Sequence, residues 1–178
     1  AAALDAGARV VNDVTALAGD PAALALVAAR GADVVLMHMQ GAPGTMQNAP
    51  AYREVTAEVV AGLRERVAAA QSAGVERGKI FIDPGIGFGK TGEQNLQLLK
   101  QLDRFRSLGL PILAGVSRKS FIGKSLGNRP VADRLAGTLG AVAGAALAGA
   151  EMARVHDVRA VVDLLTLLND TYGFSAWD

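Results

Sequence analysis

The sequence has no cysteine among its 178 residues, and aromatic residues make up only 4% of it. Disulfide bonds and thiolate metal sites are therefore excluded, and the lack of cysteine fits a protein of the reducing cytoplasm. The sequence also lacks an excess of charge, because 18 lysines and arginines are balanced by 17 aspartates and glutamates. A balanced chain has no general attraction for nucleic acid or acidic membranes, so any anion has to be bound by a local site.

Long hydrophobic runs are missing as well. The longest run is LGAVAGAALAGA at residues 139–150, which is shorter than the roughly 20 helical residues that span a bilayer. The chain starts with AAALDAGARVVNDV, which has neither the basic start nor the continuous apolar core of a signal peptide. Hydrophobic residues nevertheless make up 51% of the chain, so we expect one compact domain over residues 1–178.

Short apolar runs alternate with stretches of helical periodicity five times along the chain. The predicted strands are residues 9–13, 32–39, 79–83, 110–116 and 151–156, and the helices that follow them are residues 22–30, about 52–73, 93–105, 131–148 and 158–172. Near-continuous apolar strands separated by helices predict a parallel sheet covered by helices. Such a sheet is either open and doubly wound or closed into a β/α barrel, and periodicity alone does not distinguish the two.

Polar side chains cluster at the carboxyl ends of the predicted strands, which favours the barrel, because barrel enzymes bind their substrates at those ends. The residues concerned are Asn12, Asp13, His38, Asp83, Ser117, Arg118, Lys119, Arg154 and His156. A complete (β/α)₈ TIM barrel takes about 250 residues, whereas this sequence offers five units. We therefore expect an α/β protein of the TIM-barrel class that is truncated at its N-terminus, with the five C-terminal units present and three strands missing.

A glycine-rich stretch, GIGFGKTG at residues 85–92, is the first candidate for a binding function. A Walker A phosphate loop needs a glycine five positions before the glycine that precedes its lysine, and Pro84 occupies that position here. The better interpretation is a turn between a strand and a helix, in which glycine lets the backbone approach a ligand closely.

Asp83 and Asn12 occupy equivalent positions at the ends of two predicted strands. A carboxylate can accept a pair of N–H groups from an aminopyrimidinone ring, and an amide offers both a donor and an acceptor. The alternative for Asp83 is a helix cap or a turn carboxylate. The recurrence of a polar side chain at the same strand end favours ligand binding.

Arg154 and His156 stand two residues apart on the last predicted strand, so they project to the same side. Together they form a plausible clamp for phosphate or pyrophosphate. The spacing equally allows Arg154 to pair with Asp157 or Glu151 while a neutral His156 is hydrogen-bonded elsewhere. His38 is interpreted as a structural residue beneath the loop that follows it.

The chain contains, in this order, RVVNDV, LMHMQGAPGTMQ, IDPGIGFGK, GVSRKSFIG and ARVHDV. This series resembles the dihydropteroate synthase family, the pterin-binding β/α-barrel enzymes of folate biosynthesis that sulfonamides target. The resemblance covers essentially the whole chain. Its specific parts are SRKSFIG and MHMQGxPxTMQ, whereas NDV and DPG also occur in other pterin-binding barrels.

The resemblance implies a transferase that joins 6-hydroxymethyl-7,8-dihydropterin pyrophosphate to p-aminobenzoate, with the help of Mg²⁺, to give 7,8-dihydropteroate and pyrophosphate. It further implies a homodimer in the cytoplasm that binds small-molecule substrates and neither nucleic acid nor a membrane. No metal ligand is expected within this segment. The implied contacts are Asn12, Met37, Asp83, Phe88 and Lys119 to the pterin, Arg118 and Ser120 to p-aminobenzoate, and Arg154 and His156 to pyrophosphate. Of these residues, the implied catalytic set is Lys119, Asp83, Arg154 and His156.

The sequence departs from the family at its start, because the family's first strands carry an asparagine, an aspartate and mobile loops that have no counterpart here. One alternative is therefore a truncated module that binds a pterin or dimerises without catalysis. Another alternative is the pterin-binding domain of a corrinoid methyltransferase. Such a domain has no need for the SRKSFIG segment or for an anion clamp like Arg154 with His156.

Overall fold

The computed structural model describes residues 1–173, which form an α/β fold of alternating strands and helices. The strands are β1 (Val10–Asp13), β2 (Asp33–Met37), β3 (Ile80–Asp83), β4 (Leu113–Ala114) and β5 (Met152–Ala153). The α-helices are α1 (Ala2–Asp5), α2 (Ala23–Arg30), α3 (Val55–Ser72), α4 (Gly92–Lys100), α5 (Ser120–Ser125), α6 (Leu135–Leu147) and α7 (Val158–Tyr172). Short 3₁₀ helices cover η1 (Arg77–Lys79), η2 (Leu102–Leu108) and η3 (Val131–Asp133).

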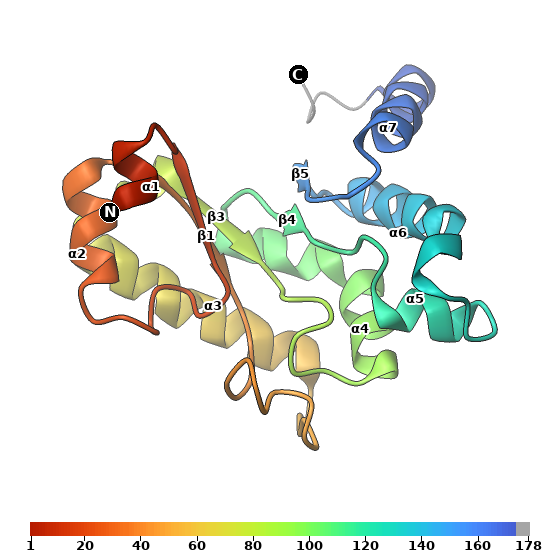
Figure 1. Cartoon of the computed structure of the whole chain (residues 1–178), viewed down its shortest axis with the longest axis horizontal. Helices are drawn as coiled ribbons and strands as arrows, with labels where there is room; N and C mark the ends of the chain where they lie inside the picture. Colours follow the sequence, from red (N-terminus) through yellow and green to blue (C-terminus); the bar gives the residue numbers. More distant parts are fainter. Residues whose placement is uncertain (174–178) are drawn as a thin grey trace.

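The strands lie side by side in the order of the sequence. β1, β2 and β3 form one parallel sheet, and β4 and β5 form a parallel pair. A parallel bridge between Ile82 and Ile112 links the two groups. A doubly wound sheet reverses its strand order at a switch point and carries helices on both faces. The strand order has no such reversal, and α3, α4 and α6 lie along one side of the strands (Figure 1).

The centre of this arc is the most deeply buried part of the described chain. Val34, Leu36, Ile80 and Ile82 on β2 and β3 are 0% exposed, as are Leu63 of α3 and Leu98 of α4. Strands covered on both faces are uniformly apolar, which explains why they were recognisable as continuous runs. At the edge of the sheet β1 pairs only with β2, and its Val10 is 46% exposed.

The structure shortens several of the predicted elements. The helix predicted at 131–148 is divided into the 3₁₀ helix η3 and the α-helix α6, which begins only at Leu135. The strands predicted at 110–116 and 151–156 reduce to β4 and β5, because only two residue pairs connect them, Leu113 with Met152 and Ala114 with Ala153. The helix predicted at 93–105 ends as an α-helix at Lys100, and residues 102–108 form the 3₁₀ helix η2. Across residues 1–173, none of the helices is long and apolar enough to cross a membrane.

Candidate active site

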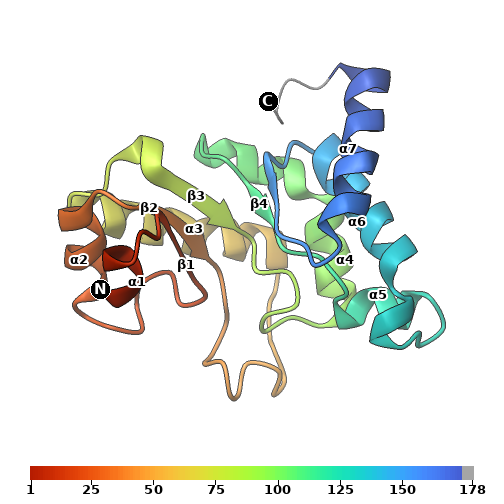
Figure 2. The same ribbon diagram turned by 45° about the horizontal axis from the view of Figure 1, so that its top comes forward.

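The loops that follow the strands meet on one side of the molecule (Figure 2), and Asp83 at the end of β3 is the buried carboxylate among them. Asp83 is 2% exposed, and its Oδ1 accepts a hydrogen bond from the backbone N–H of Gly85 at 2.7 Å. Burial raises the pKa of Asp83, and the N–H of Gly85 and the cations of Lys119, Arg154 and Lys90 act against that rise. The carboxylate therefore lies in a pocket of positive potential.

Lys119, from the loop after β4, is held against the loop after β3. Its Nζ donates to the carbonyl oxygen of Ile86 at 2.7 Å and lies 4.1 Å from the centroid of the Phe88 ring. Burial lowers the pKa of Lys119 to about 8, with Arg154 acting in the same direction and the carboxylate of Asp83 opposing it. An ammonium has three N–H groups, so the carbonyl of Ile86 leaves donors for a ligand.

Arg154, which directly follows β5, contacts β1 at the other end of the row of strands. Its Nη1 donates to Oδ1 of Asn12 at 3.1 Å, across 142 residues of sequence. The two alternative partners considered for Arg154 are engaged elsewhere, since Asp157 accepts from Arg118 and Glu151 accepts from the N–H of Ile112. Arg154 is thus directed towards the strand ends and not towards its neighbours in sequence.

His156 is oriented by Ser117, a residue that the sequence placed at a strand end but not in the site. Ser117 Oγ lies 2.8 Å from Nδ1 of His156 and accepts from the backbone N–H of His156 at 3.2 Å. The histidine is hydrogen-bonded, as one interpretation of the sequence required. It also lines a cavity, as the anion-clamp interpretation required.

That cavity, about 340 Å³ in volume, is the candidate binding site. Its lining consists of Gly115, Ser117, Lys119, Arg154, Val155 and His156. A Cβ atom added at Gly115 would lie 3.5 Å from Oδ2 of Asp83 and 3.9 Å from Nη2 of Arg154, so the carboxylate and the guanidinium meet beside this glycine. Three basic side chains and a buried carboxylate at one cavity form a site for an anion joined to a ring with N–H donors.

The two residues predicted to contact p-aminobenzoate lie apart from this cavity. The guanidinium of Arg118 donates to both carboxylate oxygens of Asp157, at 3.0 and 2.6 Å, and this contact lowers the pKa of Asp157. Ser120 is exposed and lines a neighbouring cavity of about 250 Å³ together with Gly87 and Lys124.

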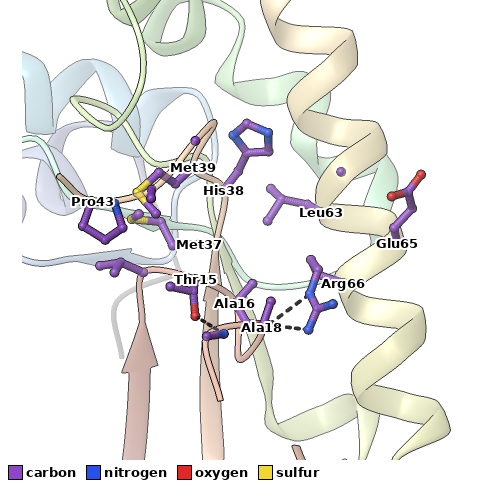
Figure 3. A pocket seen from close by; sticks show the side chains of 15 residues that line it. Thr15, Ala16, Ala18, Met37, His38, Met39, Pro43, Leu63, Glu65 and Arg66 are labelled. Atoms are coloured by element: carbon purple, nitrogen blue, oxygen red, sulfur yellow. Dashed lines mark hydrogen bonds between the residues drawn. The ribbon is translucent and has the colours of Figure 1, made fainter. Parts of the chain in front are cut away.

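Met37, predicted to line the pterin pocket, is 2% exposed and borders a different cavity of about 520 Å³ (Figure 3). This cavity lies between the loops after β1 and β2 and the middle of α3. On its wall Arg66 donates twice to the carbonyl oxygen of Ala16, at 3.0 and 2.8 Å. Asp83, Lys119 and Arg154 do not line this larger cavity.

The structure brings together Asn12, Asp83, Phe88, Lys119, Arg154 and His156. Sequence reasoning missed Ser117, although its alternation with Lys119 on the same strand end repeats the spacing of Arg154 and His156. It also missed Lys90, the lysine of the glycine-rich stretch that does not match a Walker A loop. Within residues 1–173, no group of three or more histidines, aspartates and glutamates is arranged to hold a metal ion.

Comparison with known proteins connects this site to a family. The profile of the family described as pterin binding enzyme matches residues 1–156. The dihydropteroate synthase of Escherichia coli K12 is 44% identical over 165 residues, which cover 93% of this chain and 58% of the relative. That of Mycobacterium leprae is 47% identical over 173 residues, covering 94% of this chain and 61% of the relative.

Solved structures agree with these matches. The dihydropteroate synthase of Stenotrophomonas maltophilia, with imidazole bound in its active site, has a TM-score of 0.93 at 45% identity and covers 96% of this chain and 64% of its own. The enzyme of Xanthomonas albilineans in complex with 7,8-dihydropteroate has a TM-score of 0.90 at 46% identity, covering 97% and 63%. This chain spans about three fifths of the length of the curated relatives. The chain belongs to the family of pterin-binding enzymes.

Proposed function

We propose that this chain supplies the pterin- and pyrophosphate-binding part of a dihydropteroate synthase, a transferase of folate biosynthesis. The observation that carries this proposal is the convergence of Asp83, Lys119, Arg154 and His156 beside one cavity. Relatives support it, because solved dihydropteroate synthases hold 7,8-dihydropteroate, 4-aminobenzoate or a sulfonamide drug. In this proposal the five strands are consecutive units of a (β/α)₈ barrel.

The pterin ring is bound by the buried carboxylate and the groups around it. Asp83 accepts hydrogen bonds from the N–H edge of the ring, while Asn12 offers a donor and an acceptor. Lys119 donates to the ring carbonyl or a ring nitrogen, and Phe88 flanks the ring. Met37 is the proposed contact from β2, where it pairs with Asp83. The negative charge of Asp83 also stabilises positive charge that develops on the methylene carbon of the pterin in the transition state.

The leaving group is bound at the cavity by Arg154 and His156. The bond between the methylene carbon and the pyrophosphate oxygen breaks, and pyrophosphate takes the electron pair. The guanidinium stabilises the charge that this creates. In this proposal the hydroxyl of Ser117 donates to Nδ1 of His156, 2.8 Å away, and the other ring nitrogen carries the proton that it donates to the departing anion. The amine of p-aminobenzoate then forms the new carbon–nitrogen bond and releases a proton.

The second substrate enters beside the loop after β4. Arg118 and Ser120 are the proposed contacts for the carboxylate of p-aminobenzoate. Arg118 has to exchange its two hydrogen bonds with Asp157 for the carboxylate of the substrate. Ser120 is already exposed and needs no such exchange.

Mg²⁺, dimerisation and location in the cytoplasm complete the proposal. The described residues place a single carboxylate, Asp83, beside the cavity, and that carboxylate is buried. These donors do not form a resident Mg²⁺ site by themselves. A homodimer in the cytoplasm that acts on small molecules is the assembly proposed from the family.

Replacement of Lys119 by methionine tests the function directly. In the full-length protein we expect Lys119→Met to weaken pterin binding and to slow turnover of dihydropterin pyrophosphate with p-aminobenzoate about 100-fold. Such a loss corresponds to about 2.7 kcal/mol, as expected for a charged hydrogen bond to a ligand. Calorimetry with a pterin and release of pyrophosphate are the two measurements.

Lys100→Met is the matched control, because Lys100 is an exposed lysine at the end of α4. It is expected to bind and turn over as the unchanged protein does. Normal turnover in Lys119→Met would contradict the proposal. If the unchanged protein binds a pterin without any turnover, a non-catalytic pterin-binding module is favoured instead. This is the second candidate function, because the chain covers only 58% of the length of the Escherichia coli relative.

A further inference from the structure

Lys90 is a buried cation with no part in the reaction described above. It is 2% exposed. Its Nζ donates to the carbonyl oxygens of Phe88 at 2.9 Å, Gly85 at 3.0 Å and His38 at 3.3 Å, and lies 3.3 Å from Nδ1 of His38. An ammonium has three N–H groups and accepts no hydrogen bond, so the protein itself uses the whole hydrogen-bonding capacity of Lys90.

These contacts join two segments of the chain. Gly85 and Phe88 belong to residues 84–89, which we call the β3 loop, whereas His38 directly follows β2. His38 is suited to the contact, because burial and the charge of Lys90 lower the pKa of its ring to about 4. A neutral ring can accept at Nδ1. Lys90 therefore fastens the β3 loop to the end of the neighbouring strand.

The β3 loop packs too tightly against the end of β2 to tolerate side chains at its glycines. A Cβ atom at Gly85 would lie 1.8 Å from the carbonyl oxygen of His38, and one at Gly89 would lie 2.6 Å from that of Gln40. The N–H of Gly87 donates to Oδ1 of Asn95 at 2.6 Å. The glycines predicted to bring the backbone close to a ligand thus bring it close to the neighbouring strand end.

The fixed loop in turn defines where Lys119 lies. Ile86 accepts the hydrogen bond from Lys119, and the ring of Phe88 lies beneath its ammonium. A Cβ atom at Gly87 would lie 2.7 Å from Cδ of Lys119, so the loop backbone runs along the lysine stem. The N–H of Gly85 from the same loop holds the carboxylate of Asp83.

We propose that Lys90 is a positioning residue for the pterin pocket. By binding three carbonyl oxygens it fixes the β3 loop, and the loop fixes the directions of Lys119 and Asp83. Lys90 borders the cavity that Ser120 also lines, but its Nζ donates to carbonyl oxygens of the protein, so it acts through Lys119 and Asp83. The proposal rests on the proposed function, but its effect on the loop can be measured without any substrate.

The test compares Lys90→Met with Arg77→Met in the full-length protein. Both residues are cations that bind backbone carbonyls and both flank β3, but Arg77 lies at the amino end of the strand, where it donates to Leu108 at 2.7 Å and to Gly109 at 3.1 Å. A purely structural role for Lys90 predicts the same outcome for the two variants, a loss of stability alone.

We expect Lys90→Met to raise the KM for dihydropterin pyrophosphate about tenfold and to leave the KM for p-aminobenzoate within about twofold. Arg77→Met should change neither KM. In the protein without ligand, hydrogen–deuterium exchange at residues 84–89 should become faster in Lys90→Met and remain unchanged in Arg77→Met.

Unchanged exchange at residues 84–89 in Lys90→Met overturns the proposal, and so does an unchanged KM for the pterin substrate. If the unchanged protein neither binds nor converts a pterin, the proposed function fails, and the exchange experiment still decides the role of Lys90 in the loop. Should Lys90→Met not fold, Lys90→Gln keeps one donor group and is expected to show the same differences at a smaller size.

Discussion

The loops that follow β3 and β4 each deliver a lysine to the neighbourhood of Asp83, Lys90 from the first loop and Lys119 from the second. Burial lowers the pKa of both, to about 7 for Lys90 and about 8 for Lys119, and the carboxylate opposes the shift in both. The two differ in what surrounds the ammonium. Lys90 is enclosed by carbonyl oxygens, whereas Lys119 has one carbonyl and an aromatic face and borders a cavity.

This difference separates a cation that holds the backbone from one that is left to hold a ligand. Burying a charge is tolerated only where hydrogen bonds compensate for lost water. In Lys90 carbonyl oxygens of the protein accept from all three N–H groups. In Lys119 the compensation is partial, so a ligand that adds an acceptor improves the environment of the cation. The count of satisfied donors, and not the pKa shift, distinguishes the two roles.

The largest effect is expected from breaking the packing of the β3 loop itself. Gly85 has a φ of +68° and its Cβ position collides with the carbonyl of His38. We expect Gly85→Ala to lower the free energy of unfolding by about 4 kcal/mol, a loss typical of substitutions that overpack the protein interior or strain the backbone. Denaturation by urea measures this change.

Gly127→Ala is the matched control, because Gly127 has a φ of +75° but no atom within 4 Å of its Cβ position. Only the cost of a left-handed backbone applies there, about 1 kcal/mol. Equal losses in the two variants would show that the close approach to β2 contributes nothing.

An intermediate effect is expected from a rise in pH, because deprotonation removes the positive charge of Lys119. With a pKa of about 8, the free lysine is protonated below that value and neutral above it, and a pterin that binds the ammonium raises the pKa. Pterin affinity should therefore fall as pH rises through 8, by at most about tenfold per pH unit. Calorimetry from pH 7 to 9 measures it.

The titration of the pterin itself is removed by taking the ratio of affinities between the unchanged protein and Lys119→Met at each pH. This ratio should decline above pH 8. A constant ratio would mean that the charge of Lys119 does not bind the pterin, and the contrast with Lys90 would then disappear.

The smallest effect is expected at Ser117, which orients His156 without being charged. Ser117→Ala removes the hydroxyl from Nδ1 and from the backbone N–H of His156. Of these two contacts, the one to Nδ1 orients the ring towards the anion, and one neutral hydrogen bond is worth about 1 kcal/mol, so the KM for dihydropterin pyrophosphate should rise about fivefold. Binding of a pterin without pyrophosphate should not change, and a loss there would place the effect of Ser117 on the ring and not on the anion.

Much of the fold could be predicted, because each unit carries its own local signal. β3 begins at Ile80 and ends at Asp83 as predicted to within one residue, and α7 covers Val158–Tyr172 as predicted. Among the strands, the errors fall where pairing with a neighbour decides the length. β4 and β5 extend only as far as their residues pair with each other, and no local sequence pattern shows where that pairing ends.

The residues of the site could be predicted, but the contacts between them could not. The sequence alone determined that polar residues end each strand and that glycines fill residues 85–89, since both follow from local periodicity and composition. Only the tertiary structure decided that Arg154 meets Asn12, that Arg118 binds Asp157, and that Lys90 rather than a ligand takes up the carbonyls of its loop. Hydrogen-bond partners far apart in sequence are chosen by the curvature and register of the sheet, and these belong to the whole fold.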